Sequence, residues 1–302
     1  MHRTDTAVPP ITDPLARPAR RRLTGVRGFV VRLMRTRLVL PATLVILLLV
    51  LAAALAPIIA PYGIEEGDFA ASLKGPSRDH LLGTDTLGRD IFSRVVYGAR
   101  VSLEVGIIAV GISLVVGTVL GLIAGYTRIG LLDSLIMRSM DALLAFPTLV
   151  LALAITAALG PSLTNVMIAV GIVGIPTYAR LVRGQVLSVR EREFIEAART
   201  IGVPDARIMW RHILPNVTAP LIVQASLGVA FAILSEASLS FLGLGVQPPT
   251  PSWGAMLAFG KDYLNHAPWM AIAPGAAIFI TVLAFNFLGD GIRDALDPHL
   301  HR

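Results

Sequence analysis

The 302-residue chain contains no cysteine and only two lysines, Lys74 and Lys261. The missing cysteine excludes a disulfide framework and any cysteine-ligated metal or redox site. Gly75 follows the first lysine and Asp262 follows the second, so no phosphate-binding loop ends in Gly-Lys-Ser/Thr. We therefore expect that the chain itself binds neither ATP through that motif nor any cofactor.

Charge is also scarce, because only 15% of the residues are charged whereas 54% are hydrophobic, and the mean hydropathy is +0.70. A soluble domain of this length needs more surface charge, so the composition predicts a polytopic membrane protein. The net charge of +6 does not indicate nucleic-acid binding, since the basic residues lie in an N-terminal arm and at the ends of apolar runs. No His/Asp cluster has metal-site spacing and no catalytic constellation is present, which favours a non-enzymatic protein.

Uncharged segments of membrane-spanning length predict an all-α fold with six transmembrane helices. The expected spans are residues 38–64, 105–126, two halves of 142–179, 213–235 and 268–288. The stretch 142–179 is too long for one span and contains Gly-Pro-Ser at 160–162, so we expect two helices joined by a tight turn. Pro147 and Pro176 are expected to kink these two helices.

The distribution of basic residues predicts the orientation of these spans. With both termini in the cytoplasm, 20 of the 26 lysines and arginines fall in cytoplasmic segments and six in the outer loops. The expected organisation is a basic, partly disordered, lipid-facing arm at 1–37, a first helix with its extracytoplasmic loop at 38–96, and a core of five helices at 97–302. Residues 65–100 are expected to form a mixed-charge loop after the first helix, and residues 127–141 a short charged turn.

Small residues recur every four positions in the second predicted span. They are Ser113, Gly117, Gly121 and Gly125. One smooth helix face of this kind lets the backbone of a neighbouring helix approach closely. The alternative is a chance register, because glycine is common in membrane helices.

A charged, helix-forming segment at 180–212 separates two apolar runs. Ser188 and Glu191 fit a capping box, so a helix is predicted over about 189–201. Gly202 suits the left-handed end of that helix, and Pro204 suits the first turn of a second helix. The segment is therefore predicted to form a helix, a glycine corner and another helix along the cytoplasmic face. An ordinary amphipathic interfacial helix is the alternative.

The same segment resembles the EAA motif of permease subunits of bacterial ABC importers. Glu196-Ala197-Ala198 precedes Gly202 by three residues, and Leu-Pro closes the motif, although His212 stands where the usual pattern has isoleucine. The resemblance implies a coupling helix at about 189–214 that docks in a cleft of an ATPase subunit. The residues to which it assigns this coupling are Glu196, Ala197, Ala198, Gly202, Pro204, Leu214 and Pro215.

Further motifs resemble the C-type permeases of dipeptide and oligopeptide importers over nearly the whole chain after the arm. They lie at residues 80–90, 98–103, 178–184, 239–245 and 289–298. Ile175-Pro176 departs from the tryptophan expected before the Tyr-Ala-Arg run that begins at Tyr178. The resemblance implies a type I ABC importer permease fold in a bacterial inner membrane.

The resemblance also implies partners: a second, B-type permease, two ATPase subunits that use ATP and Mg²⁺, an extracytoplasmic substrate-binding protein and a peptide substrate. The same permease type serves nickel chelates, opines and glycans, which remain alternative solutes. An ion-coupled secondary transporter, a channel and a purely structural membrane protein are more distant alternatives. Ion-coupled carriers place ionisable groups at mid-membrane, whereas the six predicted spans contain none. The patterned segment at 180–212 argues against a purely structural role.

Polar groups on or near the fifth predicted span are the candidates for the translocation path. Asn216, Gln224 and Ser226 either line a wet path or bond across helices. Glu236, at the outer end of this helix, either contacts solute or remains an interfacial carboxylate. A charged group in the outer loop forms helix-side pairs or contacts the solute-delivery protein. Its members are Asp85, Arg89, Asp90 and Arg94.

Overall fold

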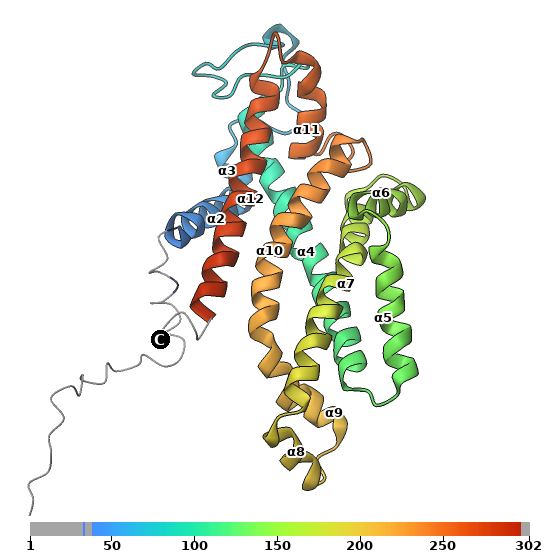
Figure 1. Ribbon diagram of the computed structural model, residues 1–302. Helices are drawn as coiled ribbons and strands as arrows, with labels where there is room; N and C mark the ends of the chain where they lie inside the picture. The colour runs from blue at the N-terminus through green and yellow to red at the C-terminus, as the bar shows by residue number, and fades with distance from the viewer. Residues whose placement is uncertain (1–32, 34–37, 297–302) are drawn as a thin grey trace, which may run out of the picture.

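The computed structural model describes residue 33 and residues 38–296, so the predicted arm at 1–37 lies almost wholly outside the described part (Figure 1). Within that part, every regular element is a helix. The extended segments make only isolated bridges, which join Gly67 to Arg89 and Thr84 to Asp90. The predicted all-helical class is confirmed.

The helices are long near the centre of the chain and short at its turns. They are α2 (Val39–Ala54), α3 (Ala56–Ile59), η1 (Phe69–Ala71), α4 (Ile91–Tyr126), α5 (Gly130–Leu144), α6 (Thr148–Leu159), α7 (Leu163–Arg190), α8 (Glu193–Thr200), α9 (Asp205–Arg207), η2 (Ile208–Ile213), α10 (Leu214–Phe241), α11 (Trp253–Gly260), η3 (Lys261–Tyr263) and α12 (Trp269–Leu296). Figure 1 shows an elongated bundle with α8 and α9 at one end and α11 toward the other.

The described part contains fewer full-length spans than the six that the sequence predicted. Four stretches are long and apolar enough to cross a membrane: α4, α7, the continuous run Asp205–Phe241, and α12. The pair α5 and α6 adds a fifth if it is one span bent by 91°. The first predicted span is shorter than expected, because α2 has 16 residues and ends just before the proline-containing α3.

Two charged segments that we predicted to be irregular are helical instead. Helix α4 begins at Ile91 rather than near 105. The Asp90 side chain caps this start, because it accepts a hydrogen bond from the Ser93 amide at 2.7 Å. The boundary expected between 96 and 97 therefore falls inside α4. Most of the predicted turn at 127–141 is α5, and Arg183 of α7 pairs with Asp133 of this helix at 2.6 Å.

The proline and glycine breaks agree in part with the sequence. Gly160 has φ of +92° and Ser162 caps α7, so the predicted turn at 160–162 is confirmed. Pro147 stands at the start of α6, next to the 91° bend between α5 and α6. Pro176 lies inside α7, which continues through it as one helix.

The central packing contact joins α4 to α7 along the small-residue face. A Cβ added to Gly117 would lie 2.6 Å from the Tyr178 Cβ, and one added to Gly121 would lie 2.6 Å from the Ala179 carbonyl oxygen. At Gly125 the same atom would lie 2.7 Å from the Val186 Cβ. The Ser113 hydroxyl donates to the Gly171 carbonyl at 2.7 Å. Glycine therefore permits backbone contact between these helices.

Candidate functional site

The end that carries α8 and α9 is built as a helix, a corner and a second helix, but it is shorter than predicted. Helix α7 continues to Arg190, so Ser188 lies in its last turn and the predicted capping box is wrong. Arg192 precedes α8 and provides no side-chain cap. Gly202 has φ of +78°, and the π-helix η2 links α9 to α10. The left-handed glycine corner is thus present at the predicted residue.

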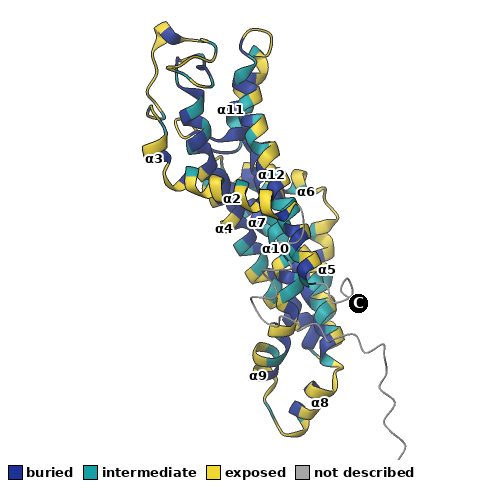
Figure 2. Cartoon of the chain, turned by 90° about the vertical axis from the view of Figure 1, so that its left-hand side faces the viewer, coloured by how far each residue is buried: buried dark blue, intermediate teal, exposed yellow. Residues whose placement is uncertain are grey.

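Helix α8 has an inner and an outer face. Ile195 and Ala198 are 0% and 6% exposed and pack into the main hydrophobic core. Glu196 and Ala197 are exposed on the other face, and Ile201 at the corner is 79% exposed. Figure 2 shows that this end of the molecule is largely exposed. One face therefore anchors α8 to the helix bundle and the other is open to solvent.

The remaining motif residues surround the corner. Gly202 is exposed and a Cβ there would meet nothing within 4 Å, so its backbone angle, not space, requires glycine. Pro204 is exposed immediately before α9. Leu214 and Pro215 begin α10, where the leucine is half-buried and the proline is exposed.

A contact that the sequence did not indicate joins this end to α4. The hydroxyl of Tyr126, the last residue of α4, donates to the Asp205 carboxylate of α9. The Arg199 guanidinium of α8 lies 5.3 Å from the centroid of the same ring. Arg190 donates to the Gly125 carbonyl at 2.8 Å. Three helices thus meet at Tyr126, and no motif in the sequence marks that residue.

A second feature is a cavity of about 340 Å³ between α4, α7 and α10. Its lining is mixed, since polar side chains stand among apolar ones. The polar residues in the lining are Ser113, Thr148, Thr177, Tyr178 and Gln224. The Tyr178 hydroxyl donates to the Gln224 carbonyl at 3.3 Å, which ties α7 to α10 beside the cavity. Such a cavity can accommodate a small polar solute or water.

Of the four candidate path residues, only Gln224 is among those that line this cavity. The Asn216 side chain donates to the His212 carbonyl at 2.7 Å, and the Ser226 hydroxyl donates to the Val223 carbonyl at 2.8 Å. Both bonds lie within their own segment of chain. In the structure these two side chains satisfy local backbone groups.

Glu236 is buried inside the protein, so the expectation of an exposed interfacial carboxylate is wrong. Its side chain is 0% exposed, and one carboxylate oxygen accepts from the Ser240 hydroxyl at 2.6 Å. Its other oxygen has no hydrogen-bond partner within the described residues. The loop after α10 folds back over this region, because Val246 approaches Ser240 and Gly254 packs on Ala237.

No group of three or more His, Asp or Glu residues within 38–296 could hold a metal ion. The outer-loop charges form a compact unit. Arg89 pairs with Asp85 at 2.7 Å, and Asp90 lies 3.1 Å from the His80 ring nitrogen. These contacts brace the segment that leads into α4.

Comparisons with known proteins give a consistent result. The family described as "Binding-protein-dependent transport system inner membrane component" matches residues 117–302, and "N-terminal TM domain of oligopeptide transport permease C" matches residues 26–76. The dipeptide transport system permease protein of Alkalihalophilus pseudofirmus is 47% identical over 99% of both chains. The glutathione transport system permease protein of Pectobacterium atrosepticum is 48% identical over 92% of both.

Two further matches extend this result. The di/tripeptide transport system permease protein of Pseudomonas aeruginosa is 50% identical over 85% of this chain and 86% of its own length. Among solved structures, a chain of the MetNI methionine ABC transporter in an inward-facing conformation matches with a TM-score of 0.56. That match covers 68% of this chain and 97% of the other at 18% identity, so it is evidence for the fold alone.

Proposed function

Because this chain belongs to the family of binding-protein-dependent transport system inner membrane components, we propose that it forms half of the membrane path of an ATP-driven importer of short peptides. The observation that carries the peptide assignment is the near full-length identity of 47–50% to permeases named for dipeptides and di/tripeptides. The oligopeptide-permease match at residues 26–76 supports the same solute class. The protein is a multi-pass component of a bacterial inner membrane.

The end that carries α8 is the proposed site of coupling to the ATPase subunits. Its exposed face presents Glu196, Ala197 and the apolar Ile201, a combination suited to a groove on a soluble partner. Its buried face, at Ile195 and Ala198, transmits displacement to the bundle because a packed core is not freely deformable. The proposed orientation places α8 and both chain termini in the cytoplasm, as the distribution of basic residues favours.

Movement reaches the bundle by two routes. One is the continuous chain from α7 through the corner into α10, which flanks the cavity. The other is Tyr126, which joins α9 to the end of α4. Closure of the ATPase pair on ATP displaces α8, and hydrolysis resets it, so the helix pair works as a two-state element.

The cavity lined by Gln224, Tyr178 and Ser113 is the proposed section of the path in this subunit. A second permease of the B type supplies the other wall, because the four or five spans of this chain cannot surround a peptide-sized path alone. An extracytoplasmic binding protein delivers the solute. ATP and Mg²⁺ are bound by the two ATPase subunits and not by this chain, whose own residues move and line the path.

The solute assignment is tested with the complete complex in proteoliposomes. Uptake of a labelled dipeptide and ATP hydrolysis are measured together, with the binding protein and ATP supplied. We expect uptake that depends on both. A complex that hydrolyses ATP in response to a nickel chelate, an opine or a glycan, and not to peptides, contradicts the peptide assignment.

The coupling assignment is tested with Gly202→Val and Glu196→Lys. Valine cannot adopt φ of +78° without strain of about 1–3 kcal/mol, so the corner changes shape. We expect membrane insertion and basal ATP hydrolysis to persist while uptake per ATP falls at least tenfold in both variants. Gly130→Val and Glu65→Lys are matched controls, because both residues are exposed and lie outside the corner. Uptake unchanged in both corner variants would refute the assignment.

A further inference from the structure

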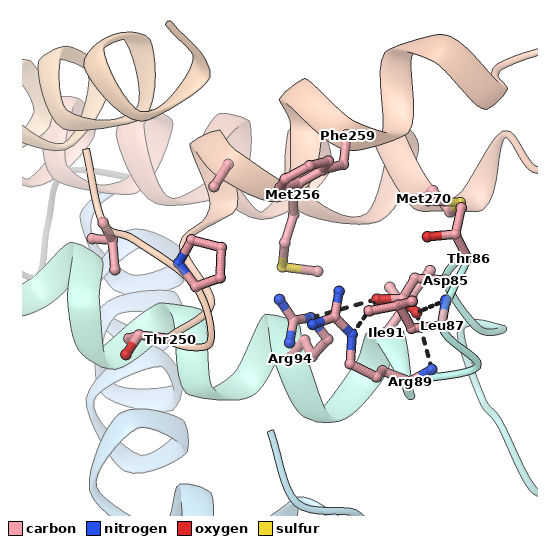
Figure 3. A pocket seen from close by; sticks show the side chains of 13 residues that line it. Asp85, Thr86, Leu87, Arg89, Ile91, Arg94, Thr250, Met256, Phe259 and Met270 are labelled. Carbon is pink, nitrogen blue, oxygen red and sulfur yellow. Dashed lines mark hydrogen bonds and ion pairs between the residues drawn. The ribbon is translucent and has the colours of Figure 1, made fainter. Parts of the chain in front are cut away.

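A second cavity, of about 240 Å³, lies at the end of the molecule opposite α8. It is enclosed by the segment that leads into α4, the loop after α10, α11 and the start of α12 (Figure 3). Three charged side chains, Asp85, Arg89 and Arg94, stand on one side of it. Apolar side chains stand on the other, so the recess has a charged end and an apolar wall.

The charged side holds two guanidinium groups and one carboxylate. Arg89 donates to one oxygen of Asp85 at 2.7 Å, and the Arg94 Nε lies 4.0 Å from the same oxygen. The other oxygen of Asp85 accepts from the backbone amides of Leu87 and Arg89, at 2.8 and 3.0 Å. Both oxygens of Asp85 are therefore occupied, and the charged side chains that line the cavity carry one positive charge in excess.

The neighbouring carboxylate of Asp90 is hydrogen-bonded away from the cavity lining. One of its oxygens accepts from the amide and the hydroxyl of Ser93, and the other lies beside His80. Asp90 is also absent from the residues that line the cavity. Arg94 is buried, and its Nη1 donates to the Ile64 carbonyl at 2.8 Å, which fixes the guanidinium at the cavity.

The apolar wall gives the recess a second preference. Met256 and Phe259 come from α11 and Met270 from α12, and Figure 3 shows Met256 directed toward the two arginines. Phe259 is 61% exposed, so part of this wall is open to solvent. A buried cation without a full counter-charge is unfavourable, and a guanidinium matches a carboxylate in shape and charge. The ligand that fits is a carboxylate joined to an apolar group.

We propose that this cavity binds the carboxyl-terminal residue of a short peptide, with Arg89 and Arg94 holding the free carboxylate and the wall of Met256 and Phe259 receiving the side chain. The volume lies just below the ~300–1,000 Å³ of sites for larger ligands, so it suits one terminal residue. The proposal rests on the proposed function, which places this end of the molecule on the extracytoplasmic side of the membrane. A free carboxylate is shared by short peptides, so such a site recognises the class and not the sequence.

The test measures direct binding to the permease complex in nanodiscs without the substrate-binding protein. Saturation-transfer NMR compares the dipeptide Ala-Phe with its carboxyl-terminal amide. We expect the free acid to bind about tenfold more tightly than the amide, as is typical when a charged hydrogen bond is lost. Arg89→Gln is expected to abolish that difference, whereas the control Arg78→Gln, an exposed residue that is absent from the cavity lining, preserves it.

A second variant guards against local unfolding of Arg89→Gln. Phe259→Ala is expected to weaken both ligands several-fold and to leave the preference for the acid intact. Equal binding of acid and amide to the wild-type complex, or equal behaviour of the Arg89 and Arg78 variants, overturns the proposal. The proposal is also overturned if the Arg89 variant binds the substrate-binding protein more weakly but still binds the peptide. In that case the cavity receives a side chain of the substrate-binding protein and not the peptide. Peptide uptake that persists alongside such results leaves the proposed function standing.

Discussion

At the scale of single residues, Tyr126 connects parts of the chain that are distant in sequence. It contacts both α8 and α9 while belonging to α4. The Nε atom of Arg199 is buried without a hydrogen-bond partner among the described residues, and the guanidinium lies within cation–π distance of the tyrosine ring. In the proposed coupling, this residue links the corner to α4.

Tyr126→Phe tests this role by removing one hydroxyl and keeping the ring. The lost bond to a carboxylate is worth about 1.5–3 kcal/mol, so uptake per ATP is expected to fall about tenfold. The measurement is coupled uptake and hydrolysis in proteoliposomes. Tyr97→Phe, on the same helix but far from the corner, is the control and is expected to behave as the wild type. An unchanged ratio in the Tyr126 variant would contradict the link.

Glu236 supplies a second prediction at this scale. Ser240→Ala removes the hydroxyl that donates to the buried carboxylate and is expected to destabilise the protein by about 1–3 kcal/mol. Ser238→Ala is the control, because its hydroxyl bonds only the Leu234 carbonyl at an exposed position, and its cost is expected to stay within about 0.5 kcal/mol. Thermal unfolding in nanodiscs compares the two, and equal losses would contradict the argument.

The burial of Glu236 could not be predicted from the sequence, because it depends on a loop that returns over α10. Gly254 and Val246, which close over this region, are 18 and 10 residues further along the chain. The glycine corner was predictable, because a left-handed backbone angle is a local property of Gly202. Tyr126 fell outside prediction since its partners come from a different part of the fold.

At the scale of elements, the close contact between α4 and α7 is the central packing contact of the bundle. Gly121→Ala places a Cβ 2.6 Å from a backbone oxygen that cannot yield easily, and overpacking of this kind costs about 1–3 kcal/mol. Gly111→Ala on the same helix is the control, because nothing lies within 4 Å of the added atom. That control is expected to be neutral or to stabilise α4 by about 0.5–1 kcal/mol.

Thermal unfolding of the two variants measures this difference directly. The close helix contact would be contradicted if Gly111→Ala and Gly121→Ala had the same stability. The small-residue register was visible in the sequence as a period of four. The sequence did not reveal that α7 is the partner helix, because helix pairing depends on the whole bundle.

The helix boundaries also depended on information that the local sequence does not contain. A Ser-x-x-Glu pattern also occurs in the last turn of a helix, so Ser188 and Glu191 did not mark a beginning. The charges of α5 suggested a turn, yet Arg183 and Arg180 of α7 pair with Asp133 and Asp141 of that helix. Ion pairs between segments are decided by tertiary structure and are not visible in local composition.

At the scale of the whole molecule, the two ends have different chemistry. The end at α8 presents an exposed face beside a buried anchor, and the opposite end holds a recess with two arginines. Between them lies the cavity beside Gln224. This order matches a conduit that receives a solute at one end and force at the other.

The most direct test of that account is cross-linking from the exposed face of α8. Because this chain has no cysteine, Ala197→Cys gives it one site for a benzophenone probe, which is attached before the complex is assembled. Ser77→Cys, on the loop at the opposite end, is the control. We predict that the probe at position 197 forms an adduct with an ATPase subunit and that the probe at position 77 does not. An Ala197 probe that labels lipid alone, in a complex that still transports, would contradict the account.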